Sequence, residues 1–218
     1  MYRNVIKRLI DMIVSGVAIV VLAVPMLIVA IAIKIDDPGP VLFKQKRIGK
    51  NKNGEVTYFM IWKFRSMKMS TPHDTPTHLL ENPEQYITRV GQFIRKTSID
   101  ELPQIYQVFT GKLSCIGPRP GLWNQVNLWE EREKYGANDV KPGITGWAQI
   151  NGRDELEIPV KAKLDGEYAA ALNAGKFKGF AMDTKCFFGT IRCVLKSDGV
   201  VEGGTGELKK KEEQKEKS

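Results

Sequence analysis

The sequence contains few of the residues that build metal centres and disulfides. Only two of its 218 residues are histidine, His73 and His78, and only three are cysteine, with no Cys-x-x-Cys spacing. These counts argue against a structural zinc site and against a disulfide framework. Because disulfides are rare in reducing compartments but common in secreted proteins, their expected absence favours a cytoplasmic location for the main part of the chain.

Acidic residues are outnumbered by basic ones. The 33 Lys and Arg exceed the 25 Asp and Glu, which gives a formal charge of +8. A positive chain suits anionic partners such as lipid head groups, phosphorylated substrates or nucleic acid. Nucleic-acid binding is disfavoured, because the cations are dispersed or flank an apolar segment and no RNP, zinc-finger or helix-turn-helix pattern occurs.

Charge is missing altogether from residues 12–33, a run of 22 residues. As a helix it would be about 33 Å long, enough to cross a bilayer. It could be a cleaved signal peptide, a spanning helix, or a re-entrant helix that enters and leaves the same face. A signal peptide is disfavoured, because its apolar region is normally about 7 to 15 residues long. Lys and Arg flank both ends, and the positive-inside rule then places both ends on the cytoplasmic side.

Pro25 lies inside this run. Proline removes one helical hydrogen bond and favours a kink, which would leave arms of about 20 Å (residues 12–24) and 12 Å (residues 26–33). Neither arm crosses a hydrocarbon core of about 30 Å, so the pattern favours a broken, re-entrant helix. A plain spanning helix stays open, because spanning helices tolerate proline.

The rest of the chain predicts a helix-rich α/β domain with a small β-hairpin. Residues 41–43 and 56–62 read as its two strands, and residues 69–86 as a surface excursion. Helical patterns occupy residues 87–95, 102–110, 122–135, 154–173 and 181–195. We therefore divide the chain into a membrane-anchoring helix (1–36), a cytoplasmic catalytic domain (37–205) and a charged, disordered tail (206–218).

Two adjacent carboxylates, Asp100 and Glu101, stand near the start of a predicted helix. One interpretation is a capping box with Ser98 as N-cap, but Pro103 would then lie where a backbone N–H is needed. With Asp100 as N-cap, proline is tolerated, and the helix start keeps the carboxylate ionised as a nucleophile must be. Neighbouring carboxylates can divide labour, one attacking phosphorus while the other holds a divalent cation. Simple capping remains the alternative.

Three short motifs supply arginines that could bind phosphate, since a guanidinium matches phosphate geometry. They are Lys63-Phe64-Arg65-Ser66-Met67, Gly117-Pro118-Arg119-Pro120, and the glycine-punctuated loop from Gly143 to Arg153. Glycines in that loop would let its backbone approach a ligand closely. Any one of these arginines could equally be a surface residue beside a turn.

Together and in this order, the motifs resemble the bacterial sugar transferase family, the monotopic polyprenyl-phosphate phosphoglycosyl transferases. The resemblance covers roughly residues 1 to 200. It also includes Lys7-Arg8 and Asp11 before the apolar run, and Gly39-Pro40-Val41-Leu42-Phe43-Lys44-Gln45 after it. Two departures are Val24, where the family often has serine, and Met182-Asp183-Thr184-Lys185 in place of a Leu-Asp-Leu-Lys-like run.

The resemblance implies transfer of a phospho-sugar from a UDP-sugar to polyprenyl (undecaprenyl) phosphate, with release of UMP. It assigns Asp100 as the nucleophile that carries the phospho-sugar, and Glu101 as a residue that helps to bind Mg²⁺. Candidate substrate-binding residues are Lys63, Arg65, Arg95, Arg119, Arg153 and, more weakly, Asp165.

The resemblance further implies a monotopic protein of the plasma membrane whose catalytic domain lies on the cytoplasmic face, among membrane lipids. The alternative is a non-catalytic membrane-bound assembly factor that keeps the fold. A homo-oligomer is left open, and no motif distinguishes one sugar from another.

Overall fold

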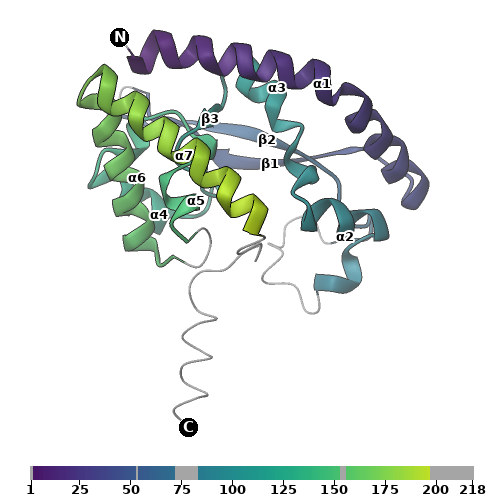
Figure 1. The fold of residues 1–218 in the computed structure, drawn as a ribbon. Coiled ribbons are helices and arrows are strands. Elements are labelled where there is room, and N and C mark those ends of the chain that lie inside the picture. Colours follow the sequence, from purple (N-terminus) through teal and green to yellow (C-terminus); the bar gives the residue numbers. More distant parts are fainter. Residues whose placement is uncertain (1, 53, 72–82, 153–155, 197–218) are drawn as a thin grey trace.

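The computed structural model describes residues 2–52, 54–71, 83–152 and 156–196, and Figure 1 shows the fold. A long amino-terminal helix, α1 (Lys7–Asp36), follows a short π-helical turn at Tyr2–Ile6 and lies along one edge of a helix-rich α/β domain. The domain helices are α2 (Arg89–Lys96), α3 (Gln104–Phe109), α4 (Val126–Glu133), α5 (Trp147–Ile150), α6 (Ile158–Asn173) and α7 (Lys176–Lys196). The predicted tail lies outside the described residues, as does most of the predicted excursion before α2.

Among the described residues the strands form two small sheets. β1 (Leu42–Ile48) and β2 (Tyr58–Phe64) pair antiparallel, which confirms the predicted hairpin; β1 is longer than expected, and β2 has the expected length but begins two residues later. β3 (Ser114–Ile116) and β4 (Gly143–Thr145) pair in parallel, a contact that the sequence did not predict. Gly117, Gly143 and Gly146 allow this pairing, because a Cβ on any of them would collide with backbone of the facing segment. These glycines thus serve backbone packing.

Helix α1 runs through Pro25 without ending, so the predicted break is absent, although Figure 1 shows the helix bending along its course. One lost hydrogen bond is tolerated within 30 residues of otherwise regular helix. By length and composition the helix could cross a membrane. Its outward side chains from Ile13 to Ile35 are more than half exposed, in particular Ile13, Val17, Val20, Val21, Val24, Leu27, Ile28, Ile31 and Ile35. An exposed apolar surface of this extent is rare on soluble proteins.

Both ends of α1 pack on the domain. Near its carboxyl end, Met26 and Ile33 are buried in one cluster with Phe64 of β2 and Ile94 of α2. There too, the Asp36 carboxylate accepts a hydrogen bond of 2.9 Å from the Val90 backbone N–H. At the other end, Tyr2 is buried in a second cluster, which includes Tyr168 and Leu172 of α6. The whole length of the apolar helix therefore stays beside the domain.

Candidate active site

The turn that carries Asp100 and Glu101 is a 3₁₀ helix, Ile99–Glu101. The prediction that Asp100 is the N-cap of the next helix is wrong, because α3 begins only at Gln104, with Pro103 as its N-cap residue. The alternative, a capping box with Ser98 as N-cap, is also absent, since Ser98 makes no side-chain cap and adopts a left-handed φ of 56°. Pro103 has no N–H to donate. The residues before it instead close as a 3₁₀ turn, with a bond of 3.1 Å from Leu102 N to Ile99 O.

Asp100 is buried, with 4% of its surface exposed. Its Oδ2 lies 3.6 Å from Lys63 Nζ at the end of β2. Burial raises the pKa of Asp100, whereas the charges of Lys63, Arg95 and Arg119 favour the ionised form and oppose that rise. Cations, and not the backbone N–H groups of a helix start, therefore favour the charged carboxylate.

Two of these cations, Arg119 and Lys63, bind Glu101 directly. Arg119 binds it in a bidentate fork, with Nη1 3.1 Å from Oε2 and Nη2 bonded to Oε1, and Lys63 Nζ lies 3.0 Å from Oε1. Burial alone would raise the pKa of Glu101, but Arg119 and Lys63 outweigh it and hold the pKa well below its usual range. Glu101 is consequently a permanent anion that fixes Lys63 and Arg119 beside Asp100.

A pocket of about 330 Å³ is lined by Arg95 and Gln92 of α2 together with Glu84 and Ile87. Of these lining residues, Arg95 is the one whose charge acts on Asp100. Lys63, Arg95 and Arg119, predicted from three separate segments, thus converge on the two carboxylates.

Two further predicted site residues, Asp165 and Arg65, bond to other partners and not to Asp100 or Glu101 in the described structure. Asp165 of α6 is fully buried, and its Oδ2 accepts hydrogen bonds from Arg132 Nε and Nη2 at 2.8 and 2.6 Å. Arg132 Nη2 also donates to the Arg119 backbone oxygen at 2.9 Å, so Asp165 supports Arg119 through Arg132.

Arg65 holds the segment after α1 in place, because it bonds to Asp37 and, at 2.7 Å, to the Pro40 backbone oxygen. Arg153 lies outside the described residues.

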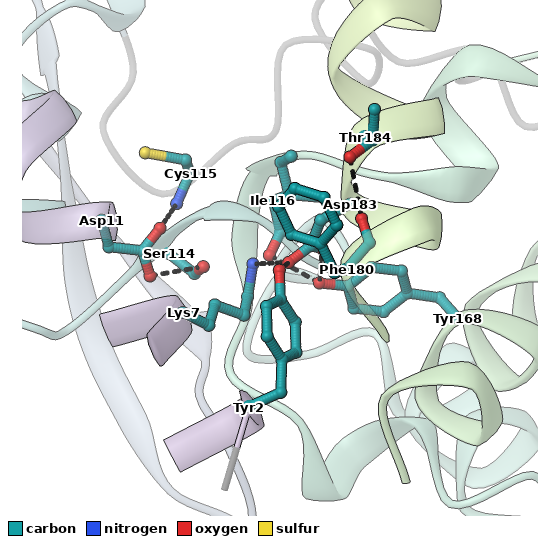
Figure 2. Close-up of polar contacts among 10 residues, drawn as sticks. All are labelled: Tyr2, Lys7, Asp11, Ser114, Cys115, Ile116, Tyr168, Phe180, Asp183 and Thr184. Atoms are coloured by element: carbon teal, nitrogen blue, oxygen red, sulfur yellow. Dashed lines mark hydrogen bonds and ion pairs between the residues drawn. The ribbon is translucent and has the colours of Figure 1, made fainter. Parts of the chain in front are cut away.

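Sequence reasoning missed Arg132, because it stands in the run Glu130-Glu131-Arg132-Glu133-Lys134, which looks like a solvated helix face. It also gave no role to Asp183, which accepts hydrogen bonds from Tyr2 Oη (2.5 Å), Lys7 Nζ (2.8 Å) and Tyr168 Oη (2.8 Å). Figure 2 shows these side chains meeting at Asp183 of α7. The sequence indicated this cluster only through the charged residues Lys7, Arg8 and Asp11, which precede the apolar run.

Figure 2 also shows Asp11 of α1 directed at β3, where its carboxylate accepts bonds from Ser114 Oγ (2.7 Å) and Cys115 N (2.9 Å). The charged residues before the apolar run therefore lock α1 onto the domain. A charged side chain is stable in a buried position only when it is paired and hydrogen-bonded, as Lys7 and Asp11 are here.

The donor set at Asp100 and Glu101 is compatible with a magnesium ion shared with a substrate. No group of three or more His, Cys, Asp or Glu that could hold a metal occurs within the described part of the chain. Magnesium commonly takes only one or two carboxylates and completes its shell with water and substrate phosphates. Two adjacent hard oxygen donors among cations fit that pattern.

Residues 2–197 match the family model described as bacterial sugar transferase. The chain is 40% identical over 197 residues to an undecaprenyl-phosphate glucose phosphotransferase of Komagataeibacter xylinus, covering 85% of this chain and 35% of that protein. It is 37% identical over 196 residues to the sugar transferase EpsL of Bacillus subtilis, covering 90% of each. It is 36% identical over 202 residues to an N-acetylgalactosaminephosphotransferase of Aeromonas hydrophila that is named for UDP-N-acetylgalactosamine and undecaprenyl phosphate, covering 89% of this chain and 44% of that protein.

Proposed function

Because the chain belongs to the bacterial sugar transferase family, we propose that it transfers a sugar phosphate from a UDP-sugar to undecaprenyl phosphate and releases UMP. The observation that carries the proposal is Asp100, a buried carboxylate under the charges of Lys63, Arg95 and Arg119. The names of the relatives supply the acceptor and the class of donor.

In the first step a carboxylate oxygen of Asp100 attacks the phosphorus that bears the sugar. The bond from that phosphorus to the bridging oxygen breaks, and UMP departs with this oxygen and its electron pair. The sugar phosphate remains on Asp100 as an acyl phosphate. Lys63, Arg95 and Arg119 stabilise the charge that moves onto the phosphate oxygens.

In the second step an oxygen of undecaprenyl phosphate attacks the same phosphorus. The acyl phosphate bond breaks, the Asp100 carboxylate is restored and undecaprenyl-diphosphate-sugar is formed. The covalent intermediate lets a water-soluble donor and a lipid acceptor use the site in turn, so the kinetics are ping-pong.

Glu101, with Asp100 beside it, would hold a magnesium ion at this site. Bound there, the ion would neutralise the diphosphate of the donor. Both Glu101 oxygens already receive hydrogen bonds from Lys63 or Arg119, so these cations would shift toward substrate phosphates as the ion binds.

We also propose that α1, which is unbroken but bent, enters and leaves the membrane on the same face, and that the catalytic domain lies on the cytoplasmic face of the plasma membrane. The support is the packing of both helix ends on one domain. A straight spanning helix would carry one end about 30 Å away from that domain, across the hydrocarbon core. The exposed apolar side of α1 would then face lipid.

The test of function is UMP release by the purified protein with magnesium, undecaprenyl phosphate and a panel of UDP-sugars including UDP-glucose, UDP-galactose and UDP-N-acetylgalactosamine. One donor should give UMP and a lipid-linked sugar diphosphate in equal amounts. A folded protein that releases no UMP from any donor would support the non-catalytic assembly factor instead.

The pH dependence should identify the cations that act on Asp100. Because burial raises the pKa of Asp100 and only the carboxylate attacks, kcat/KM should rise with pH through a pKa above that of an ordinary aspartate. Lys63 lowers this pKa, so Lys63→Met should shift the acidic limb to still higher pH, besides reducing the rate. The control is Lys163→Met on the exposed side of α6. An unmoved acidic limb in Lys63→Met would contradict the assigned pairing.

Labelling should distinguish the re-entrant from the spanning topology. Single cysteines are introduced as Asn4→Cys and Lys34→Cys, both at exposed positions, after the three native cysteines are replaced by serine. Neither should react with a membrane-impermeant maleimide added outside spheroplasts, and both should react in inside-out vesicles. Labelling of one position from each side would establish a spanning helix.

A further inference from the structure

A second pocket, of about 210 Å³, lies at the amino end of α1 and shares no lining residue with the carboxylate site. Its cations come from three regions of the chain. Arg3 lies in the π-helical turn before α1, Lys7 and Arg8 begin α1, Lys50 follows β1, and Lys141 precedes β4. Of the acidic side chains in the described part of the chain, only that of Asp11 lines the pocket.

Most of this positive charge is not neutralised by carboxylates. Lys7 is paired with Asp183. Arg8, in contrast, donates to the backbone oxygens of Val108 and Phe109, both at 2.6 Å, and forms no ion pair with a described carboxylate. Arg3 likewise donates to an amide and a backbone oxygen. Lys50 and Lys141 form no ion pair with any described residue.

The cations are close enough to affect one another. Burial lowers the pKa of Lys141, and the charges of Arg8, Lys50 and Lys7 lower it further. Asp11 opposes this effect but is already bonded to Ser114 and Cys115. The pocket therefore holds an excess of positive charge that an anion would relieve.

The position of the pocket suggests the anion. Asp11 is followed directly by Met12, where the uncharged run begins, so a membrane that takes up the apolar side of α1 places the pocket at the level of lipid head groups. Phosphate is the anion concentrated in that layer. The Arg8 guanidinium, held by two backbone oxygens, still has N–H donors to offer it.

We propose that this pocket binds a phosphate group, presented by an anionic phospholipid of the surrounding leaflet. The proposal rests on the proposed membrane placement of α1 but not on the transfer reaction. It gives the start of α1 a specific lipid contact, in addition to the bonds to Asp183 and β3.

The experiment uses the full chain in an uncharged detergent, where no bilayer surface potential contributes. Native mass spectrometry counts phosphatidylglycerol retained per protein, phosphatidylcholine serves as the zwitterionic comparison, and inorganic phosphate is titrated separately by calorimetry. We expect one tightly retained phosphatidylglycerol, and a loss of affinity of about fivefold in each of Lys50→Ala and Lys141→Ala. Lys34→Ala, at the other end of α1, is the matched control and should retain the lipid. UMP release is measured on the same samples, so that loss of lipid binding and loss of activity are read independently.

Equal retention of phosphatidylglycerol by the wild type, Lys50→Ala and Lys141→Ala would overturn the proposal. Binding of inorganic phosphate that depends on Lys141, without retention of phosphatidylglycerol, would show a phosphate pocket for a soluble anion and overturn the lipid assignment. If Lys141→Ala does not fold, the conservative Lys141→Arg variant should retain the lipid, and its failure to do so while folded would also count against the pocket.

Discussion

Asp100→Asn should abolish turnover, lowering UMP release by at least about 10⁴-fold, the scale of loss when a covalent nucleophile is removed. The substitution keeps the shape of the side chain but replaces the carboxylate with an uncharged amide, which is too weak a nucleophile to attack phosphorus. It should not unfold the protein, because the ionised side chain is the form that burial disfavours, and Lys63 keeps its contact with Glu101. The measurement is UMP release in a single turnover.

The same experiment should show the covalent intermediate directly. Wild-type protein incubated with a donor labelled in the sugar-side phosphate, without acceptor, should retain label that hydroxylamine removes, whereas Asp100→Asn should retain none. Asp139→Asn provides the matched control, because Asp139 also lies in a 3₁₀ turn but is exposed. Normal turnover by folded Asp100→Asn would reject Asp100 as the nucleophile.

The sequence predicted the parts of the site that depend on local motifs. The predicted hairpin placed Lys63 at a strand end, and the motifs around Asp100 and Arg119 were recognised as candidate parts of one phosphate-binding site. It did not predict the geometry of the turn that carries Asp100 and Glu101. Pro103 was expected inside a helix begun at Asp100, but it starts α3 instead and leaves the carboxylates on a 3₁₀ turn. Sequence patterns place a helix boundary only to within a few residues, and here the chain closes a 3₁₀ turn before Pro103 instead of beginning the helix at Asp100.

The sequence also could not predict which side chains would bond to one another across long stretches of chain. Arg65 stands two residues after Lys63 and was given the same role, yet its guanidinium turns to Asp37 and Pro40 across 28 and 25 residues of chain. Asp183 and Lys7 are 176 residues apart. Contacts of this kind depend on how α1 folds back on the domain, so charge spacing within a segment cannot reveal them.

Arg132 and Asp165 form the buried pair with the largest expected effect on stability. Asp165→Ala would leave the Arg132 guanidinium buried without its carboxylate, a loss of about 3 to 5 kcal/mol in the free energy of unfolding. In a chain of this size that corresponds to a fall in Tm on the order of 10 °C. Thermal unfolding in detergent measures it, and Asp139→Ala is the exposed control.

The double variant Asp165→Leu/Arg132→Met separates stability from positioning. Asp165 Oδ1 is buried without a hydrogen-bond partner, so the native pair is incompletely satisfied, and apolar replacement of both residues should recover most of the lost stability. Activity should not recover, because the Arg119 backbone oxygen has lost its Arg132 donor and Arg119 then grips Glu101 less firmly. We expect kcat to stay about tenfold or more below the wild type, the cost of misplacing one charged group in a preorganised site. A double variant with restored Tm and wild-type kcat would show that the pair supports the fold alone and does not position Arg119.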